Sequence, residues 1–163
     1  MYHADQEFLR MAIALAYHAR QRGADPFGAI LVVDGTIVHQ TEDRSVELSD
    51  PTYHAELAAI SECCRAQQRF SLAGYTLYSN AEPCVMCSGA IKWAGISRVV
   101  FSVSQAMLQQ LSGGRPKPDC ASIINSGNRQ VEIVGPLLQE EGLPVFEGFS
   151  FSSKIGRHRA LRG

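Results

Sequence analysis

Two segments of the chain carry side chains of the kinds that serve as ligands for a divalent metal, and a common site requires the fold to bring them together. The first is His54-Ala55-Glu56, and the second is Pro83-Cys84-Val85-Met86-Cys87. One imidazole and two thiolates suit zinc, and a catalytic zinc typically has three protein ligands and a fourth position open to water. The sequence therefore predicts that His54, Cys84 and Cys87 hold one zinc ion.

Glu56 lies two residues after the predicted ligand His54 and is not needed as a ligand, which leaves it free to move protons. The pattern H-x-E followed by P-C-x-x-C is the established signature of zinc-dependent nucleobase deaminases, in which the Glu is the general acid and base. A lone C-x-x-C would be weaker evidence, because redox motifs and structural zinc sites share it. The alternative is a structural zinc in an interaction module, where a neighbouring carboxylate has no purpose.

The hypothesis that follows is a hydrolytic deamination in which Glu56 is the catalytic residue. Zinc can lower the pKa of a bound water to about 7. Glu56 would take that proton, give it to a ring nitrogen, and then protonate the departing amine. Backbone N–H groups near Ala55 and Cys84 are candidates to stabilise the developing charge, and Phe27 is a candidate to stack on the ring.

Size and composition indicate one domain in a reducing compartment. The chain has 163 residues, a net charge of −1 and five cysteines, an odd number that argues against a disulfide framework. Charged residues near the start of the chain argue against a signal peptide, and no apolar run is long enough to cross a bilayer. We expect a cytoplasmic deaminase domain over residues 1–150, followed by a basic tail over residues 151–163.

Hydrophobic spacing and breaker residues predict alternating helices and strands. Asp34-Gly35 between two short apolar runs is a strong hairpin signal. Residues 112–119 are rich in glycine and proline, which interrupt helices and strands, and are predicted to form either a lid or a plain connection. The predicted helices cover residues 5–22, 52–69, 83–94 and from about 136, and the predicted strands cover residues 29–33, 36–40, 75–79, 98–103 and 131–134.

The order of these elements predicts an α/β fold, a three-layer sandwich around a mixed five-stranded sheet. The hairpin strands should be antiparallel, and the later strands, separated by helices, largely parallel. Residues two apart point to nearly opposite faces of a helix. His54 and Glu56 can therefore converge only if a helix begins at the site, and Pro83 suits the first position of the helix that carries Cys84 and Cys87.

Most of the chain resembles the cytidine deaminase superfamily, in its guanine deaminase and tRNA adenosine deaminase branch. The segments Pro26–Ala29, Asp50–Glu56 and Glu82–Ile91 look like that branch's first strand and its two metal motifs. The Trp93-Ala94 pair is more similar to guanine deaminases than to tRNA enzymes. The resemblance implies a homodimer or larger assembly whose pockets are partly built by a neighbouring chain. Asn80 is a further candidate substrate contact.

Two departures from the branch concern substrate recognition. Asp43 stands where the branch usually has an Asn that hydrogen-bonds the base, and an ionised carboxylate only accepts hydrogen bonds. Asp43 would therefore prefer a ring N–H or amino group, unless it lies in a surface loop. No clear acid follows Phe101 to hold the 2-amino group of guanine, and Ser104, Gln105 and Gln109 are there instead.

Several substrates stay open, with guanine or a related amino-heterocycle first. A tRNA adenosine deaminase is second, because it needs a basic surface and only the tail offers one. Free nucleosides are third. The tail itself, with Lys154, Arg157, His158, Arg159 and Arg162, is expected to be a solvated charged terminus rather than an RNA-binding segment.

Overall fold

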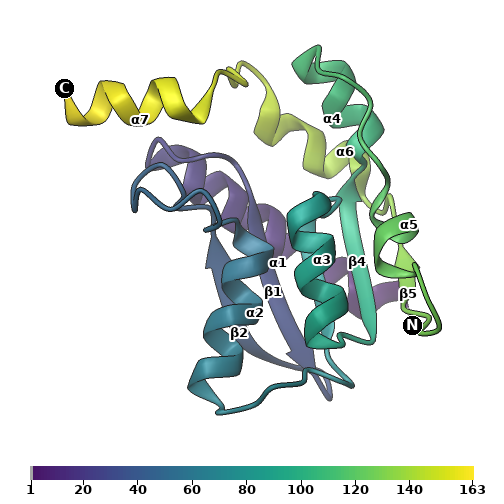
Figure 1. Cartoon of the computed structure of the whole chain (residues 1–163). Coiled ribbons are helices and arrows are strands. Elements are labelled where there is room, and N and C mark those ends of the chain that lie inside the picture. The colour runs from purple at the N-terminus through teal and green to yellow at the C-terminus, as the bar shows by residue number, and fades with distance from the viewer. Residues whose placement is uncertain (1) are drawn as a thin grey trace.

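The chain forms a five-stranded mixed sheet between two layers of helices (Figure 1). This computed structural model describes residues 2–163. The strands lie in the order β2-β1-β3-β4-β5. Their bounds are β1 Gly28–Val33, β2 Thr36–Glu42, β3 Thr76–Ala81, β4 Arg98–Val103 and β5 Glu132–Val134. The helices are α1 Tyr2–Gln21, α2 Ala55–Ala66, α3 Val85–Ala94, α4 Gln105–Ser112, α5 Cys120–Ile124, α6 Gln139–Gly142, a 3-10 helix Leu143–Phe146, and α7 Lys154–Arg162.

The pairing directions confirm the predicted α/β class. Strand β1 pairs antiparallel with β2 and with β3, whereas β3, β4 and β5 are parallel. The two-residue turn of the β1–β2 hairpin has Asp34 and Gly35 both at positive φ, 50° and 72°. This is the geometry that favours an Asp-Gly turn between strands. The parallel strands need longer crossovers, which α3 and the α4–α5 segment provide.

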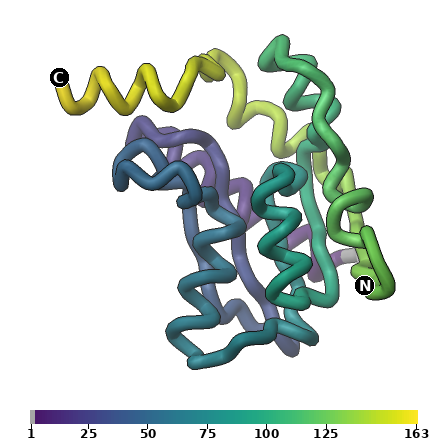
Figure 2. Tube along the Cα trace, in the orientation of Figure 1, coloured from purple at the N-terminus to yellow at the C-terminus, as the bar shows by residue number. Residues whose placement is uncertain are grey.

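Alternate residues of the central strands point to opposite faces and build two main cores. Leu31, Leu77 and Val99 pack under α2 and α3. Ile30, Tyr78 and Val100 pack on the other face with Leu9 of α1. These strands are buried on both faces, as expected for a sheet with helices on each side. The tube view shows α1 behind the sheet and α2 and α3 in front (Figure 2).

Gly28 allows α1 to approach the first strand closely. A Cβ at this position would lie 2.5 Å from Leu15 Cβ and 2.6 Å from the carbonyl oxygen of Ala12. Asn80 fixes the same point from the other side, because its Oδ1 accepts from Gly28 N at 2.9 Å and its Nδ2 donates to the Pro26 carbonyl at 3.0 Å. The start of β1 is thereby held against β3, next to the site described below.

The structure differs from the sequence expectations mainly after β4. Helices α4 and α5 were not predicted; Ser104 and Asp119 cap their first turns by accepting from Met107 N and Ser122 N. The last predicted helix begins at Gln139 and not at Pro136, because Leu138 adopts a left-handed conformation. Pro83 lies just outside α3 and does not occupy its first turn, since Cys84 is the N-cap.

The expected basic tail is a bound helix and not a solvated terminus. Lys154 and Arg157 of α7 form ion pairs with the buried carboxylates of Asp25 and Asp43.

Among the described residues, none of the helices combines the length and apolar character needed to span a membrane.

Candidate active site

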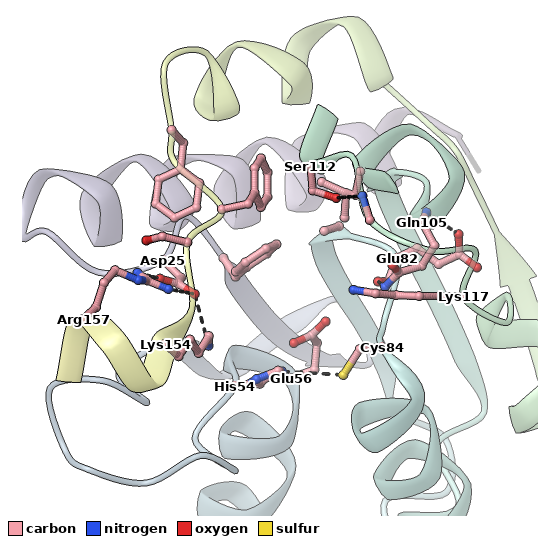
Figure 3. Close-up of a pocket in the computed structure, with 17 residues that line it drawn as sticks. Asp25, His54, Glu56, Glu82, Cys84, Gln105, Ser112, Lys117, Lys154 and Arg157 are labelled. Carbon is pink, nitrogen blue, oxygen red and sulfur yellow. Dashed lines mark hydrogen bonds and ion pairs between the residues drawn. The ribbon is translucent and has the colours of Figure 1, made fainter. Parts of the chain in front are cut away.

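The two predicted metal motifs meet at the N-termini of neighbouring helices. His54 is the N-cap of α2 and Cys84 the N-cap of α3, and both have extended backbones, with φ/ψ of −77°/151° and −69°/173°. An N-cap side chain usually bonds to the helix backbone, but neither of these does so. Instead, Cys84 Sγ lies 3.5 Å from His54 Nδ1 (Figure 3). The expectation that the first motif lies where a helix begins is correct.

His54, Cys84 and Cys87 form a set of three ligand atoms that all lie within 4.8 Å of one another. Cys87 is fully buried in the first turn of α3, one turn from Cys84. One nitrogen and two sulfurs at this spacing match a zinc site with three protein ligands.

The charges of this set also fit a divalent cation. A hydrogen bond with Cys87 lowers the pKa of Cys84 to about 3, and His54 assists while burial opposes. The same hydrogen bond and burial raise the pKa of Cys87 well above its usual range. Two thiolates beside the Glu56 carboxyl would place several negative charges in one buried volume. A divalent metal would compensate them and allow both sulfurs to ionise.

Glu56 lies in the first turn of α2 and is almost completely buried. Ser79 Oγ donates to its Oε1 at 3.3 Å, and Cys87 Sγ donates to its Oε2 at 3.5 Å. Burial raises the pKa of Glu56, and the negative charge on Cys84 raises it further. A carboxyl group with a raised pKa can both accept and return a proton near neutral pH.

A cavity of about 360 Å³ opens above this set, and His54, Glu56 and Cys84 line it (Figure 3). Phe27 also lines the cavity and lies 5.6 Å, ring centre to ring centre, from Phe146. The remaining lining residues come from the segment before β1, the end of β3, α4, the loop after α4 and the C-terminal segment; they are Asp25, Ala81, Glu82, Gln105, Leu108, Ser112, Gly114, Lys117, Phe149, Phe151, Ser152, Lys154 and Arg157. The 112–119 loop therefore contributes to the cavity and is more than a connection.

Three of the predicted substrate contacts do not reach this cavity. Asp43 is buried, and its carboxylate accepts from Ser45 and from Lys154. The Asn80 amide is occupied by the backbone bonds to Gly28 and Pro26. Ala55 has a buried side chain at the start of α2. Of the four candidates, only Phe27 lines the cavity.

Sequence reasoning missed the residues that support the site. Ser79 is a single small polar residue in a buried strand, and nothing in its pattern links it to Glu56. The buried Glu82 carboxylate accepts from the backbone N–H groups of Gln105 and Cys120, both at 2.8 Å. It therefore ties the starts of α4 and α5 to the end of β3. The only sequence feature that could have indicated the role of Glu82 is the presence of a charged residue between a predicted strand and the Pro-Cys motif.

The fold and the His54, Cys84 and Cys87 set are those expected of a metal-dependent hydrolase. The family model of the cytidine and deoxycytidylate deaminase zinc-binding region matches residues 2–103. The chain belongs to this family and is a deaminase of the cytidine deaminase superfamily.

The relatives divide among several substrates. A probable cytosine deaminase of Schizosaccharomyces pombe is 35% identical over 150 residues, which cover 89% of this chain and 91% of that one. A tRNA-specific adenosine deaminase of Aquifex aeolicus is 43% identical over 95 residues, 58% of this chain and 63% of that one. The solved structure of guanine deaminase from Bacillus subtilis has a TM-score of 0.63 and 27% identity, covering 91% of this chain and 96% of that one.

Proposed function

We propose that this chain catalyses the zinc-dependent hydrolytic deamination of a small free amino-heterocycle, with guanine as the first candidate. The amine is replaced by a carbonyl, and ammonia is released. The observation that carries the proposal is the position of Glu56, which contacts Cys87 on one side and lines the cavity on the other. A metal site that served only to stabilise the fold would gain nothing from a buried carboxylate there.

The proposed roles follow from the geometry. His54, Cys84 and Cys87 would hold one zinc ion, which supplies the Lewis acidity that makes water nucleophilic near neutral pH. Glu56 accepts a proton from the attacking water, passes it to a ring nitrogen, and then protonates the departing amine. Ser79 keeps the carboxylate oriented through its bond to Oε1. The N–H groups at the starts of α2 and α3 have no intrahelical partners and can stabilise negative charge.

The wall of the cavity favours a free heterocycle over a nucleotide within RNA. The C-terminal segment contributes Phe149, Phe151, Lys154 and Arg157 to the lining. The rings of Phe149 and Phe151 meet edge to face at 5.1 Å. This apolar surface suits a flat ring, and a polymer substrate would have to displace it.

Recognition of guanine would involve Gln105 and not an acid. Gln105 lines the cavity, and its Nε2 donates to the Glu82 carbonyl at 2.9 Å. Its side-chain oxygen would be the atom that accepts from a ring amino group, because an amide oxygen is an acceptor. This arrangement supports a substrate with an exocyclic amine in addition to the one that is removed.

The test is an ammonia-release screen of the purified protein with its zinc content measured. Guanine, adenine, cytosine, pterins and aminotriazines are tested, and the free bases are compared with their nucleosides. We expect one zinc per chain and turnover of at least one free base. Stoichiometric zinc without ammonia release from any compound would contradict the proposal and favour a structural metal site.

A second candidate is tRNA adenosine deamination. It is supported by the 43% identity to the Aquifex aeolicus relative and by the exposed basic residues Arg115 and Lys117 in the loop beside the cavity. Tight tRNA binding that weakens steeply with added salt would place this function first. Binding that is weak at low salt would exclude it.

We also propose that the protein is a homodimer joined through the α2–α3 face. Phe70 and Trp93 are 93% and 86% exposed there, beside a shallow hollow lined by Leu57 and Ile60. Large exposed apolar side chains grouped on one face are typical of association surfaces. Trp93→Asp should shift the mass measured by light scattering to that of the monomer, whereas an unchanged mass would show that this face is free.

A cytoplasmic location is proposed as well. All five cysteines are free thiols in the structure, as expected in a reducing compartment. Cell fractionation tests it directly.

A further inference from the structure

Four charged residues, three of which line the cavity, form a cluster that we call the acid–base cluster. It consists of Asp25 and Asp43 from the body of the protein and of Lys154 and Arg157 from α7. Asp25 and Asp43 are 4% and 1% exposed, so both carboxylates depend on protein partners and not on water. Asp25, Lys154 and Arg157 line the cavity that Glu56 also lines (Figure 3).

Lys154 is the centre of the acid–base cluster. Its Nζ lies 2.8 Å from Asp43 Oδ2, 3.2 Å from Asp25 Oδ2 and 2.7 Å from Ser45 Oγ. Asp43 and Ser45 accept hydrogen bonds from two of the three donors of the ammonium group, and Asp25 forms an ion pair with it. Lys154 is therefore held in place on the cavity wall by three contacts to the body of the protein.

Asp43 holds Lys154 and does not face the cavity. Its Oδ1 accepts from Ser45 N at 3.0 Å and from Ser45 Oγ at 2.6 Å, while Oδ2 accepts from Lys154. The position expected to bind the heterocycle is thus used to anchor the C-terminal helix. A neutral amide there would bind Lys154 less strongly, since charge-assisted hydrogen bonds are roughly twice as strong as neutral ones.

Helix α7 depends on these ion pairs because it buries no residue of its own. Its two large apolar side chains, Ile155 and Leu161, are 67% and 69% exposed. Its hydrogen bonds to the body outside the acid–base cluster include those of His158 and Arg162 with Ser49 Oγ, at 2.7 and 3.1 Å. Without apolar burial, loss of a charge in the cluster should release the helix.

The acid–base cluster also fixes the aromatic part of the wall. Arg157 pairs with Asp25, and its guanidinium lies 5.8 Å from the centre of the Phe149 ring. Phe149 in turn contacts Phe151, which stacks at 6.1 Å on Phe146. The position of α7 and the shape of the cavity are therefore coupled through a continuous series of contacts.

We propose that Lys154, held by Asp43 and Asp25, determines specificity by fixing α7 as the wall that admits a free base and excludes its nucleoside. The inference rests on the proposed deamination of free heterocycles. Lys154 is a positioning residue, because it acts through the wall and does not touch the reacting atoms. Substitution of Lys154 should enlarge the cavity on this side and make room for a ribose.

The test compares Lys154→Met with Arg159→Met, a control that removes a positive charge from the exposed part of the same helix. Hydrogen exchange of the amides in residues 154–162 should accelerate about tenfold or more in Lys154→Met, because breaking a largely buried charge pair is strongly destabilising. The ratio of kcat/KM for guanosine to that for guanine should rise by about the same factor, through a lower KM for the nucleoside. The same comparison is made for adenosine with adenine and cytidine with cytosine.

The double variant Asp43→Asn/Lys154→Met keeps the result interpretable if Lys154→Met folds poorly. It removes both charges, so no unpaired carboxylate is left at position 43. We expect stability to recover while fast exchange in α7 and the raised nucleoside ratio persist. Return of both properties to wild-type values would overturn the inference, since Lys154 would then only neutralise Asp43.

Failure of the inference and failure of the proposed function give different results. Hydrogen exchange needs no substrate, and the ammonia screen is made on the wild-type protein. A wild type that deaminates a free base, with an unchanged nucleoside ratio in Lys154→Met, refutes the specificity role alone. A wild type that deaminates no heterocycle refutes the proposed function, and the specificity role fails with it.

Discussion

Replacing Glu56 with glutamine should abolish turnover while leaving the fold and the metal site intact. The carboxylate oxygens lie 3.3 Å from Ser79 Oγ and 3.5 Å from Cys87 Sγ, and an amide of the same shape can stay in this position. It cannot carry a proton between water and substrate. General acid–base catalysis contributes about 10²- to 10⁴-fold. Because one residue is proposed to make every transfer here, we expect a loss of about 10⁴-fold, or about 5.5 kcal/mol.

The assay combines three measurements on the same preparation: ammonia release, zinc content and unfolding in urea. Glu62→Gln is the matched control, since Glu62 lies in the same helix and contacts His39 and Tyr53, away from the cavity. It should keep wild-type turnover. Glu56→Gln should retain its zinc and be at least as stable as the wild type, because it removes a buried group whose charged form is costly.

Two results would refute this reasoning in different ways. Near-normal turnover in a Glu56→Gln protein with stoichiometric zinc would show that another group moves the proton. Loss of zinc from the variant would show that Glu56 supports the metal site and would leave its catalytic role without support.

Three further predictions concern metal, pH and packing. Chelation should remove activity and lower the melting temperature, with the far-ultraviolet circular dichroism retained because the sheet cores lie apart from Cys84; complete unfolding would assign the metal a structural role. Burial raises the pKa of Asp25, but Arg157 and Lys154 outweigh it and hold the pKa below its usual value. The unfolding free energy should therefore decrease as the pH falls below about 3.9 and through the lower folded-state pKa, and this decrease should be smaller in Asp25→Asn. Glu82→Gln should cost about 1–3 kcal/mol in urea unfolding, since an amide N–H would then face a backbone N–H; an unchanged midpoint would contradict this.

Much of the fold could be predicted because the signals were local. The Asp34-Gly35 turn specifies its hairpin through two positive φ angles, and apolar runs with helices between them specify parallel strands. The candidate metal set was equally accessible, since the spacing in His54-x-Glu56 and Cys84-x-x-Cys87 indicated the three side chains whose ligand atoms the fold brings within 4.8 Å of one another. The same spacing required a helix to begin at His54, and it does.

Helices α4 and α5 escaped prediction because both are short and are stabilised by contacts distant in sequence. Their first N–H groups bond to Glu82, which precedes them by 23 and 38 residues. A local hydrophobic pattern carries no information about such a partner. The same limit applies to Ser79, whose role depends on a strand lying beside the start of α2.

The sequence by itself determined the class of chemistry, because the proposed metal ligands and the proposed proton carrier stand in short motifs. Only the tertiary structure decided what surrounds that chemistry. Asp43 suggested a substrate contact, yet its carboxylate binds Lys154, which follows it by 111 residues. The basic tail suggested a solvated terminus, yet it is a helix on the cavity wall. An ion pair between two residues that are far apart in the sequence depends on where the whole fold places them. No local sequence pattern encodes that position.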